Sequence, residues 1–260
     1  MAGTAGARAE ESAAPRHHVA IIVALAAEAR SLEKASRSQS SEARDKSFPV
    51  IVRSGPGPRR AAEAARHALE SGATALVSWG LAGGLVDLAP TGTAIIPHHI
   101  VCQGRATLAA DAFWRGKLIR KLGPDFAIDS GRLLSVDRAL RSPATKAARA
   151  LESGAVAADM ESAAIGAVAH AAGAPFLVVR VVVDDYRDQL PDSIETWVSE
   201  TGKIRIAPIA RTLLAPRELG LLMVLARRSR VAQRVLARLA GVLMPTNFCC
   251  ARESDDRCAG

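Results

Sequence analysis

Carboxylates gather where predicted strands give way to predicted helices. The stretch from Ala157 to Gly166, A-A-D-M-E-S-A-A-I-G, places Asp159 and Glu161 between an apolar strand and a helix. Asp184 ends a second apolar strand, and Glu28 lies just past the first strand of the chain. Because carboxylates can take up or donate a proton during a reaction, these residues are candidates for general acid–base chemistry.

A purely structural interpretation also accounts for the first pair. Asp159 can cap the helix that follows it, and Glu161 falls in the first turn, where the helix dipole favours a solvated carboxylate. Glu28 has the same alternative as a first-turn residue of the helix after the first strand. On local sequence alone, both interpretations remain open.

The next strand favours a functional site. Residues 175–183, P-F-L-V-V-R-V-V-V, form a long β-branched run that ends in Asp184-Asp185. Such a run is typical of a strand buried on both faces of a parallel sheet. Ligands bind outside the carboxyl ends of strands in open α/β sheets. We therefore expect Glu161 and Asp184 to lie together on the ligand edge of one sheet.

Strands and helices alternate along the chain. The fold class expected is α/β, a three-layer α/β/α sandwich with a central mixed, mostly parallel twisted sheet. One domain, 17–244, is expected between a disordered leader, 1–16, and a flexible tail, 245–260. Strands are predicted at 18–25, 48–54, 73–79, 132–136, 155–157 and 175–183, with paired or bent strands at 93–97 and 100–103. Helices are predicted from 26 onward and at 58–70, 109–122, 142–151, 160–172 and 216–244.

Composition narrows the function classes. The 260 residues are 49% hydrophobic, enough for a sizeable core, and a net charge of +8 suits anionic ligands. Aromatic residues make up 3% of the chain, which argues against a stacking platform for single-stranded nucleic acid. We expect a cytoplasmic protein, because no signal peptide, membrane span, disulfide framework or zinc spacing is present in this sequence. His98 and His99 read as surface residues, so we predict no metal.

Two glycine-rich turns follow predicted strands. Gly55, Gly57 and Arg59 open the helix at 58–70, where free N–H groups can hold an anion such as phosphate, although such turns are common. The turn is neither a Rossmann fingerprint nor a Walker A loop. After residues 73–79, Ala82, Gly83 and Gly84 would let a flat group lie against the backbone, or simply form a tight turn.

Five segments, in this order, resemble the nucleoside phosphorylase and methylthioadenosine/S-adenosylhomocysteine nucleosidase superfamily. The resemblance covers about 19–191, and the segment 201–219 also resembles the hopanoid-biosynthesis-associated phosphorylases. The five segments are V-A-L-A-A-E-A (23–29), S-G-P-G (54–57), S-W-G-L-A-G-G-L (78–85), A-D-M-E-S-A (158–163) and V-R-V-V-V-D-D (179–185).

The resemblance implies cleavage of the N-glycosidic bond of a purine nucleoside by a homo-oligomer. Asp184 would protonate the leaving base, and Glu161 would accept the sugar hydroxyls and favour a cationic transition state. Met160 would pack on the ribose, and Glu28 matches the carboxylate that orients water in the nucleosidases. Ala82, Gly83 and Gly84 would line the base site.

The nucleophile is either phosphate or water. Ser78 and Leu81 stand where hexameric phosphorylases carry phosphate-binding residues, so phosphate would depend on Gly55, Gly57 and the arginines nearby, Arg53, Arg59 and Arg60. The resemblance at 201–219 nevertheless favours phosphorolysis, and it implies a hopanoid-linked adenosine as substrate, with inorganic phosphate as co-substrate and no cofactor. Hydrolysis is the close alternative.

Two other functions are alternatives to an enzyme. One is a nucleoside-binding protein that has lost its chemistry, and the other, less favoured, is a nucleic-acid-binding module. The helix at 216–244 carries arginines opposite a leucine stripe, which predicts either peripheral contact with an anionic membrane or packing on the core with a solvated arginine face. The arginines are Arg227, Arg230, Arg234 and Arg238, and the stripe includes Leu221, Leu225, Leu236, Leu239 and Leu243.

Overall fold

The computed structural model describes residues 18–37, 49–102, 104, 106–191, 193–197, 199–203, 205 and 216–244. The predicted leader, 1–16, and the predicted tail, 245–260, lie outside the described residues. So does most of the segment 201–219 that carries the hopanoid-related resemblance.

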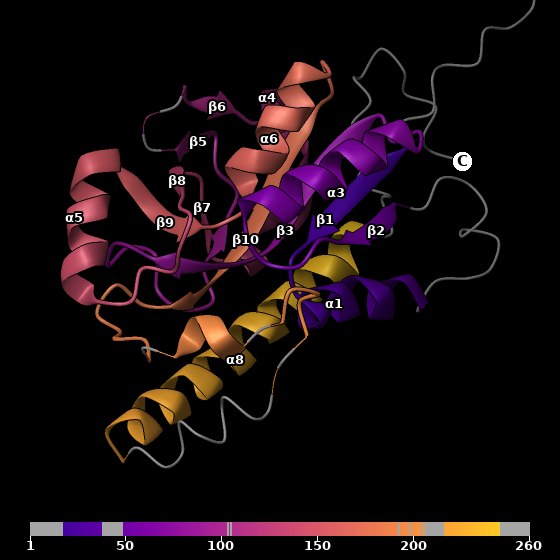
Figure 1. The fold of residues 1–260 in the computed structure, drawn as a ribbon. Helices are drawn as coiled ribbons and strands as arrows, with labels where there is room; N and C mark the ends of the chain where they lie inside the picture. The colour runs from indigo at the N-terminus through magenta and orange to yellow at the C-terminus, as the bar shows by residue number, and fades with distance from the viewer. Residues whose placement is uncertain are drawn as a thin grey trace, which may run out of the picture.

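Ten strands and six α-helices alternate along the described part of the chain (Figure 1). The strands are β1 (Val19–Val23), β2 (Val50–Arg53), β3 (Ala75–Gly84), β4 (Ala94–Ile95), β5 (His99–Cys102), β6 (Leu108–Ala109), β7 (Ile128–Asp129), β8 (Arg132–Ser135), β9 (Ala155–Asp159) and β10 (Phe176–Asp184). The helices are α1 (Ala26–Arg37), α3 (Pro58–Glu70), α4 (Ala112–Leu122), α5 (Pro143–Ser153), α6 (Ser162–Ala171) and α8 (Pro216–Leu243).

The ten strands form one mixed sheet, in which most neighbouring strands run parallel. Its main order is β6-β5-β8-β9-β3-β10-β4-β7, and β1 joins β3 and carries β2. The pairs β1–β3, β3–β10 and β8–β9 are parallel, whereas β9 meets β3 and β4 meets β10 in antiparallel orientation. The predicted fold class is confirmed.

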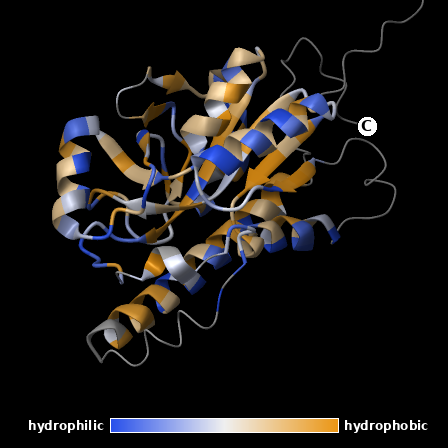
Figure 2. Ribbon diagram, in the orientation of Figure 1, coloured by the Kyte–Doolittle hydropathy of each residue, from blue (hydrophilic) through white to orange (hydrophobic). Residues whose placement is uncertain are grey.

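Helices cover both faces of the sheet because successive side chains of a strand point to opposite sides. Ile21 and Val77 pack with α1, α4 and α8 on one face. Ile22 and Leu76 pack with α3 and α6 on the other face, and α5 lies outside β8 and β9. Figure 2 shows the strands coloured mainly as hydrophobic and hydrophilic residues along the outer helices.

Gly83 brings two distant parts of the chain together. In β3 it pairs with Asp184 of β10 on one side and with Ala158 of β9 on the other. The sequence predicted that Glu161 and Asp184 would meet at one edge of a parallel sheet. Both residues do line one pocket, but neighbouring parallel strands do not bring them together. Instead, β9 runs antiparallel to β3, and the end of β3 lies between the ends of β9 and β10, which carry Glu161 and Asp184.

Several predicted boundaries need correction. Residues 93–97 and 100–103 do not pair with each other, because β4 pairs with β10 and β7 while β5 pairs with β6 and β8. The helix predicted at 109–122 starts at Ala112, after Asp111 accepts the Trp114 N–H as its N-cap. The strand predicted at 73–79 extends to Gly84, so the glycine run belongs to β3 and is not a turn.

The long helix α8 packs on the body of the protein through its C-terminal half. Leu236, Leu239 and Leu243 are buried there, as the core-packing alternative predicts. Figure 1 shows the other half extending away from the sheet. The exposed large apolar residues on α8 are Leu219, Met223, Val224 and Val231. Among the described residues, no helix combines the length and apolar composition that a membrane span requires.

Candidate active site

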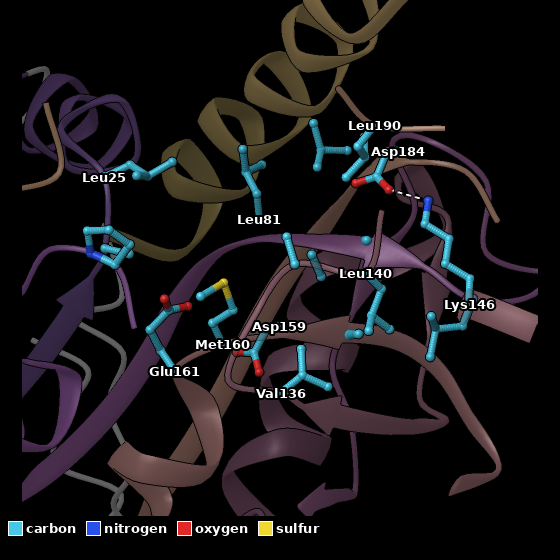
Figure 3. Close-up of a pocket in the computed structure, with 18 of the residues that line it drawn as sticks. Leu25, Leu81, Val136, Leu140, Lys146, Asp159, Met160, Glu161, Asp184 and Leu190 are labelled. Atoms are coloured by element: carbon cyan, nitrogen blue, oxygen red, sulfur yellow. Dashed lines mark hydrogen bonds and ion pairs between the residues drawn. The ribbon is translucent and has the colours of Figure 1, made fainter. Parts of the chain in front are cut away.

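A pocket of about 210 Å³ lies where the ends of β1, β3, β9 and β10 converge. It collects all three predicted catalytic carboxylates, Glu28, Glu161 and Asp184, together with the predicted ribose contact Met160. Figure 3 shows Glu161 at one end of the pocket, Asp184 beside Lys146 at the other, and Met160 between them. The rest of the lining is largely apolar and includes Leu25, Leu81, Val136, Leu140 and Leu190.

Glu28 is a buried side chain that closes the turn between β1 and α1. Its Oε2 accepts the N–H groups of Ala24 and Leu25 at 3.0 and 2.8 Å, and its Oε1 accepts the N–H of Leu81 at 3.0 Å. A Cβ placed on Gly80 would lie 2.5 Å from Oε1, so glycine there lets β3 approach the carboxylate. Glu28 therefore joins the ends of β1 and β3 at the pocket.

Arg180 is the cation beneath the Glu28 and Glu161 end of the pocket. It lies in the middle of β10, almost completely buried, with Nη2 2.7 Å from Oδ2 of Asp159 and 3.6 Å from Oε2 of Glu161. Nη2 also donates to the Ser78 hydroxyl at 2.7 Å. Because an unpaired buried charge is costly, these contacts explain why an arginine is tolerated inside an otherwise apolar strand.

The contacts of Asp159 and Glu161 differ from those expected if the two residues only capped a helix. Oδ2 of Asp159 accepts the Ser162 N–H at 3.0 Å, which supports the first turn of α6 while the same oxygen pairs with Arg180. Glu161 is not a solvated first-turn residue. It is buried, and its Oε1 accepts the Gly57 N–H at 2.9 Å.

Burial raises the pKa of two of the pocket carboxyls near Arg180, those of Glu161 and Glu28. For Glu161, burial outweighs the opposing Arg180 charge and, together with the nearby Asp159, raises the pKa to about 7. Burial also raises the pKa of Glu28, against the effect of Arg180 and of three backbone N–H groups. One guanidinium thus faces three carboxyl groups, and burial favours the protonated form of Glu28 and Glu161 despite that positive charge.

Asp184 occupies the opposite end of the pocket in an equally buried position. Burial raises its pKa, and the ammonium group of Lys146, which forms an ion pair with Oδ2, opposes that rise. The neighbouring Asp185 has a different environment. Although burial raises its pKa, hydrogen bonds from Arg228 and Thr91 bring the pKa below its ordinary value. Asp184 is therefore the better placed of the two to hold a proton.

The predicted base-site residues do not all reach the pocket. Ala82 and Gly83 line it, and a Cβ on Gly83 would lie 3.3 Å from both carboxylate oxygens of Asp184. Gly84 lies outside the lining. A Cβ there would approach the backbone oxygen of Ala89 to 2.8 Å, so this glycine serves backbone packing.

The predicted phosphate turn is already engaged by protein groups. The Gly57 N–H donates to Glu161, and the side chain of Arg59 is 75% exposed and pairs with Glu63 on the surface of α3. Gly55 packs against the backbone of Glu200, where a Cβ would meet the carbonyl oxygen at 1.9 Å. Neither Gly55, Gly57 nor Arg59 lines the pocket.

Sequence reasoning missed two cations of the site. Arg180 stands inside the quoted V-R-V-V-V-D-D segment, and an arginine within a strand predicted to be buried on both faces is itself a signal for carboxylate partners. Lys146 gave no comparable signal. It lies in the first turns of α5, where a lysine normally reaches solvent.

A comparison with protein-family models shows the family of this chain. The model of the phosphorylase superfamily matches residues 18–215, which span most of the chain and all of the pocket. The chain belongs to the phosphorylase superfamily. No curated protein sequence matches this superfamily member.

Solved structures of other proteins share this fold of the phosphorylase superfamily. One is the 5′-methylthioadenosine/S-adenosylhomocysteine nucleosidase of Neisseria meningitidis in complex with methylthio-immucillin-A, with a TM-score of 0.62 and 20% identity over 86% of this chain and 98% of that one. Another is the futalosine hydrolase of Helicobacter pylori, with a TM-score of 0.64 and 13% identity over 86% of this chain and 97% of that one. At such identities, the likeness establishes the fold.

Proposed function

We propose that this protein cleaves the N-glycosidic bond of a purine nucleoside, with adenine as the base. The observation that supports this best is that one pocket holds a buried, protonatable Asp184 at one end and Glu161 at the other (Figure 3). Glu28 also lines the pocket and lies close enough to Glu161 to raise its pKa. Glycosidic cleavage needs an acid for the leaving group and negative charge beside the sugar cation, at separate positions. The family and the nucleosidases among its structural neighbours support the proposal.

The Glu161 end of the pocket is the sugar side in this proposal. Glu161 would accept hydrogen bonds from the ribose hydroxyls, and its charge would stabilise the oxocarbenium-like transition state. Met160 lies between the two ends of the pocket, where its flexible apolar side chain can pack on the sugar ring (Figure 3). Arg180 and the Gly57 N–H hold Glu161 in place.

The Asp184 end is the base side. As the C–N bond breaks, its electron pair moves to the purine, and Asp184 transfers its proton to a purine nitrogen. Ala82, Gly83 and the nearby Leu140 and Leu190 give this end small or apolar walls that suit a flat heterocycle (Figure 3).

Water is the nucleophile that the geometry supports best. The backbone N–H groups of Ala24, Leu25 and Leu81 would form an anion site at the ends of β1 and β3, but the Glu28 carboxylate already accepts all three. An ionised Glu28 can take a proton from water, whereas it would repel a phosphate dianion. The occupied Gly57 N–H removes a further donor for phosphate.

Phosphorolysis is the second candidate, with inorganic phosphate as co-substrate. It is favoured by the raised pKa of Glu28, because a neutral carboxyl group donates a hydrogen bond to phosphate instead of repelling it. The resemblance of residues 201–219 to the hopanoid-biosynthesis-associated phosphorylases points the same way. On that resemblance alone, we propose a hopanoid-linked adenosine as the substrate. Assembly as a homo-oligomer is a further proposal, which rests on the resemblance to the superfamily as a whole.

Peripheral membrane contact through α8 also stays a proposal. The exposed apolar residues Leu219, Met223 and Val224 lie on the N-terminal half of α8, which extends from the body, and Val231 is exposed on the half that packs on it. Arg227 on the extending half and Arg230 and Arg234 on the packed half are also exposed, and such a surface suits an anionic membrane carrying a lipid-linked substrate.

The main rival is a nucleoside-binding protein without chemistry. Binding a neutral nucleoside does not require carboxyls held in low-dielectric positions with raised pKa values, which cost stability. The test is to incubate the purified protein with a panel of adenine nucleosides that differ at the 5′ position and to follow free adenine. Calorimetric binding without release of adenine would establish the rival.

A further inference from the structure

Lys146 is a buried lysine on a helix that otherwise lies at the surface. Among the residues of α5, all of which the structure describes, it alone is buried, with a side chain 1% exposed. It also lines the pocket, beside Asp184 (Figure 3). A buried ammonium group loses its hydration, so its position must be stabilised by specific partners.

Those partners belong to the last residue of β10 and to the turn that follows it. Nζ of Lys146 forms an ion pair with Oδ2 of Asp184 and donates to the carbonyl oxygens of Asp185 at 2.6 Å and Asp188 at 3.3 Å. An ammonium group has three N–H donors, and each now has an acceptor. Oδ1 of Asp184 has no hydrogen-bond partner among the described residues.

The same turn is fixed from the opposite side by α8. Arg228 forms an ion pair with Asp185, and its Nε lies 2.9 Å from Oδ2 of Asp188. Asp185 and Asp188 are the other charged groups close to Asp184, and Arg228 neutralises part of their charge. The cation that acts directly on the Asp184 carboxyl is therefore Lys146.

We propose that Lys146 is the positioning residue of the general acid: it holds Oδ2 of Asp184, directs Oδ1 toward the leaving base, and stabilises the carboxylate formed by proton transfer. This inference rests on the proposed glycosidic cleavage. In that step, the C–N electron pair moves to the base, the O–H bond of Asp184 breaks, and an N–H bond forms on the purine. Lys146 keeps its own protons throughout.

The physical effect is a balance between burial and charge. Burial makes Asp184 a carboxyl that stays protonated more readily than usual but gives up its proton reluctantly, and the Lys146 charge offsets the second effect. Removing the charge should raise the pKa of Asp184 further. The acid would then remain protonated to higher pH and would transfer its proton more slowly.

The test compares two substrates in wild type, Lys146→Met and Lys146→Arg. Adenosine requires protonation of its base, whereas p-nitrophenyl riboside releases a stable phenolate without an acid. We expect Lys146→Met to lower kcat/KM for adenosine about tenfold or more, to spare the nitrophenyl riboside, and to move the alkaline limb of the pH profile upward. Lys146→Arg should keep the alkaline limb of the pH profile where it is in wild type, because arginine retains the positive charge. Lys117→Met, an exposed lysine of α4, is the matched control.

Equal losses on both substrates would show a merely structural role and overturn the inference, as would an unchanged adenosine profile. A second comparison applies even where Lys146→Met folds poorly. If Lys146 acts through Asp184, then adding Lys146→Met to Asp184→Asn should not lower adenosine cleavage further, whereas an additive loss would contradict the inference. A folded wild type that releases adenine from none of the 5′-substituted adenine nucleosides would refute the proposed function itself.

Discussion

Nη2 of Arg180 lies 2.7 Å from Oδ2 of Asp159, and both side chains are almost completely buried. This contact joins the middle of β10 to the end of β9. Although burial lowers the pKa of Arg180, the charges of Asp159, Glu161 and Glu28 raise it above its ordinary value. One cation therefore organises the carboxyl groups at the sugar end of the pocket. Its loss should affect the fold as well as the chemistry.

Arg180→Met should destabilise the protein by about 3 kcal/mol or more, because it leaves buried carboxyls without their cation. Urea unfolding monitored by circular dichroism measures the change. Arg59→Met is the control, since that exposed arginine forms a surface pair with Glu63 and its loss should change stability by less than about 1 kcal/mol. Equal effects of the two substitutions would contradict the proposed role of Arg180.

Asp184→Asn should lower the turnover of adenine nucleosides by about a hundredfold or more, since an amide cannot protonate the base. From the sequence, little loss of folding is expected. The ion pair with Lys146 revises that expectation, because the variant leaves a buried ammonium group unpaired and should unfold more readily, by about 3 kcal/mol. Turnover assays and urea unfolding measure the two effects.

The exposed Asp87 provides the control for Asp184, because Asp87→Asn should leave both turnover and stability unchanged. Near-normal turnover of folded Asp184→Asn would remove Asp184 as the acid, and Asp185 would be the next residue to substitute.

Glu161 should make stability depend on pH. Its pKa is about 7 in the folded protein against 4.5 for the ordinary group, so the folded state retains a proton that the unfolded state releases. The resulting stabilisation is fully present below pH 4.5 and is lost as the pH rises through 7. Glu161→Gln removes this titration.

We therefore expect the stability of Glu161→Gln relative to wild type to increase between about pH 5 and pH 8, whatever constant offset the amide introduces. Urea unfolding of both proteins across this range measures the difference. A difference that does not vary with pH, or one that varies in the opposite direction, would contradict the raised pKa of Glu161.

The arginines of α8 provide a test of membrane contact. Reversing Arg227, Arg230 and Arg234 to Glu should weaken retention on phosphatidylserine vesicles, at about 1 kcal/mol per charge near the surface. The triple reversal of Arg66, Arg120 and Lys121, exposed residues of α3 and α4, is the matched control. Retention that falls equally in both variants would indicate a general effect of net charge and not a membrane-binding helix.

Strong local patterns explain why much of the fold could be predicted. The apolar β-branched run before Asp184 defines β10, and Pro58 places the start of α3 correctly. The same reasoning located Glu28, Glu161 and Asp184, because each follows a buried strand and the pocket forms where those strands end. The position of each carboxylate relative to a strand end was therefore enough to predict that it lies at the pocket.

Long-range partners explain what could not be predicted. The local sequence around Gly57 indicates free N–H groups, but Glu161, 104 residues later in the chain, occupies one of them. Similarly, Lys146 has an ordinary helical context and becomes a buried pocket residue because the turn after β10 packs over it. Such pairings depend on tertiary structure, which a single sequence does not display.

Product analysis with and without phosphate tests the central claim most directly. The purified protein is incubated with adenosine and its 5′-substituted analogues, and free base and sugar products are separated by chromatography. The site geometry predicts free adenine and free ribose at undiminished rate in phosphate-free buffer, with Glu28 as the base that activates water. Activity that requires phosphate and yields ribose 1-phosphate would assign phosphorolysis instead. Absence of free base from every nucleoside, in either buffer, would contradict glycosidic cleavage by this pocket.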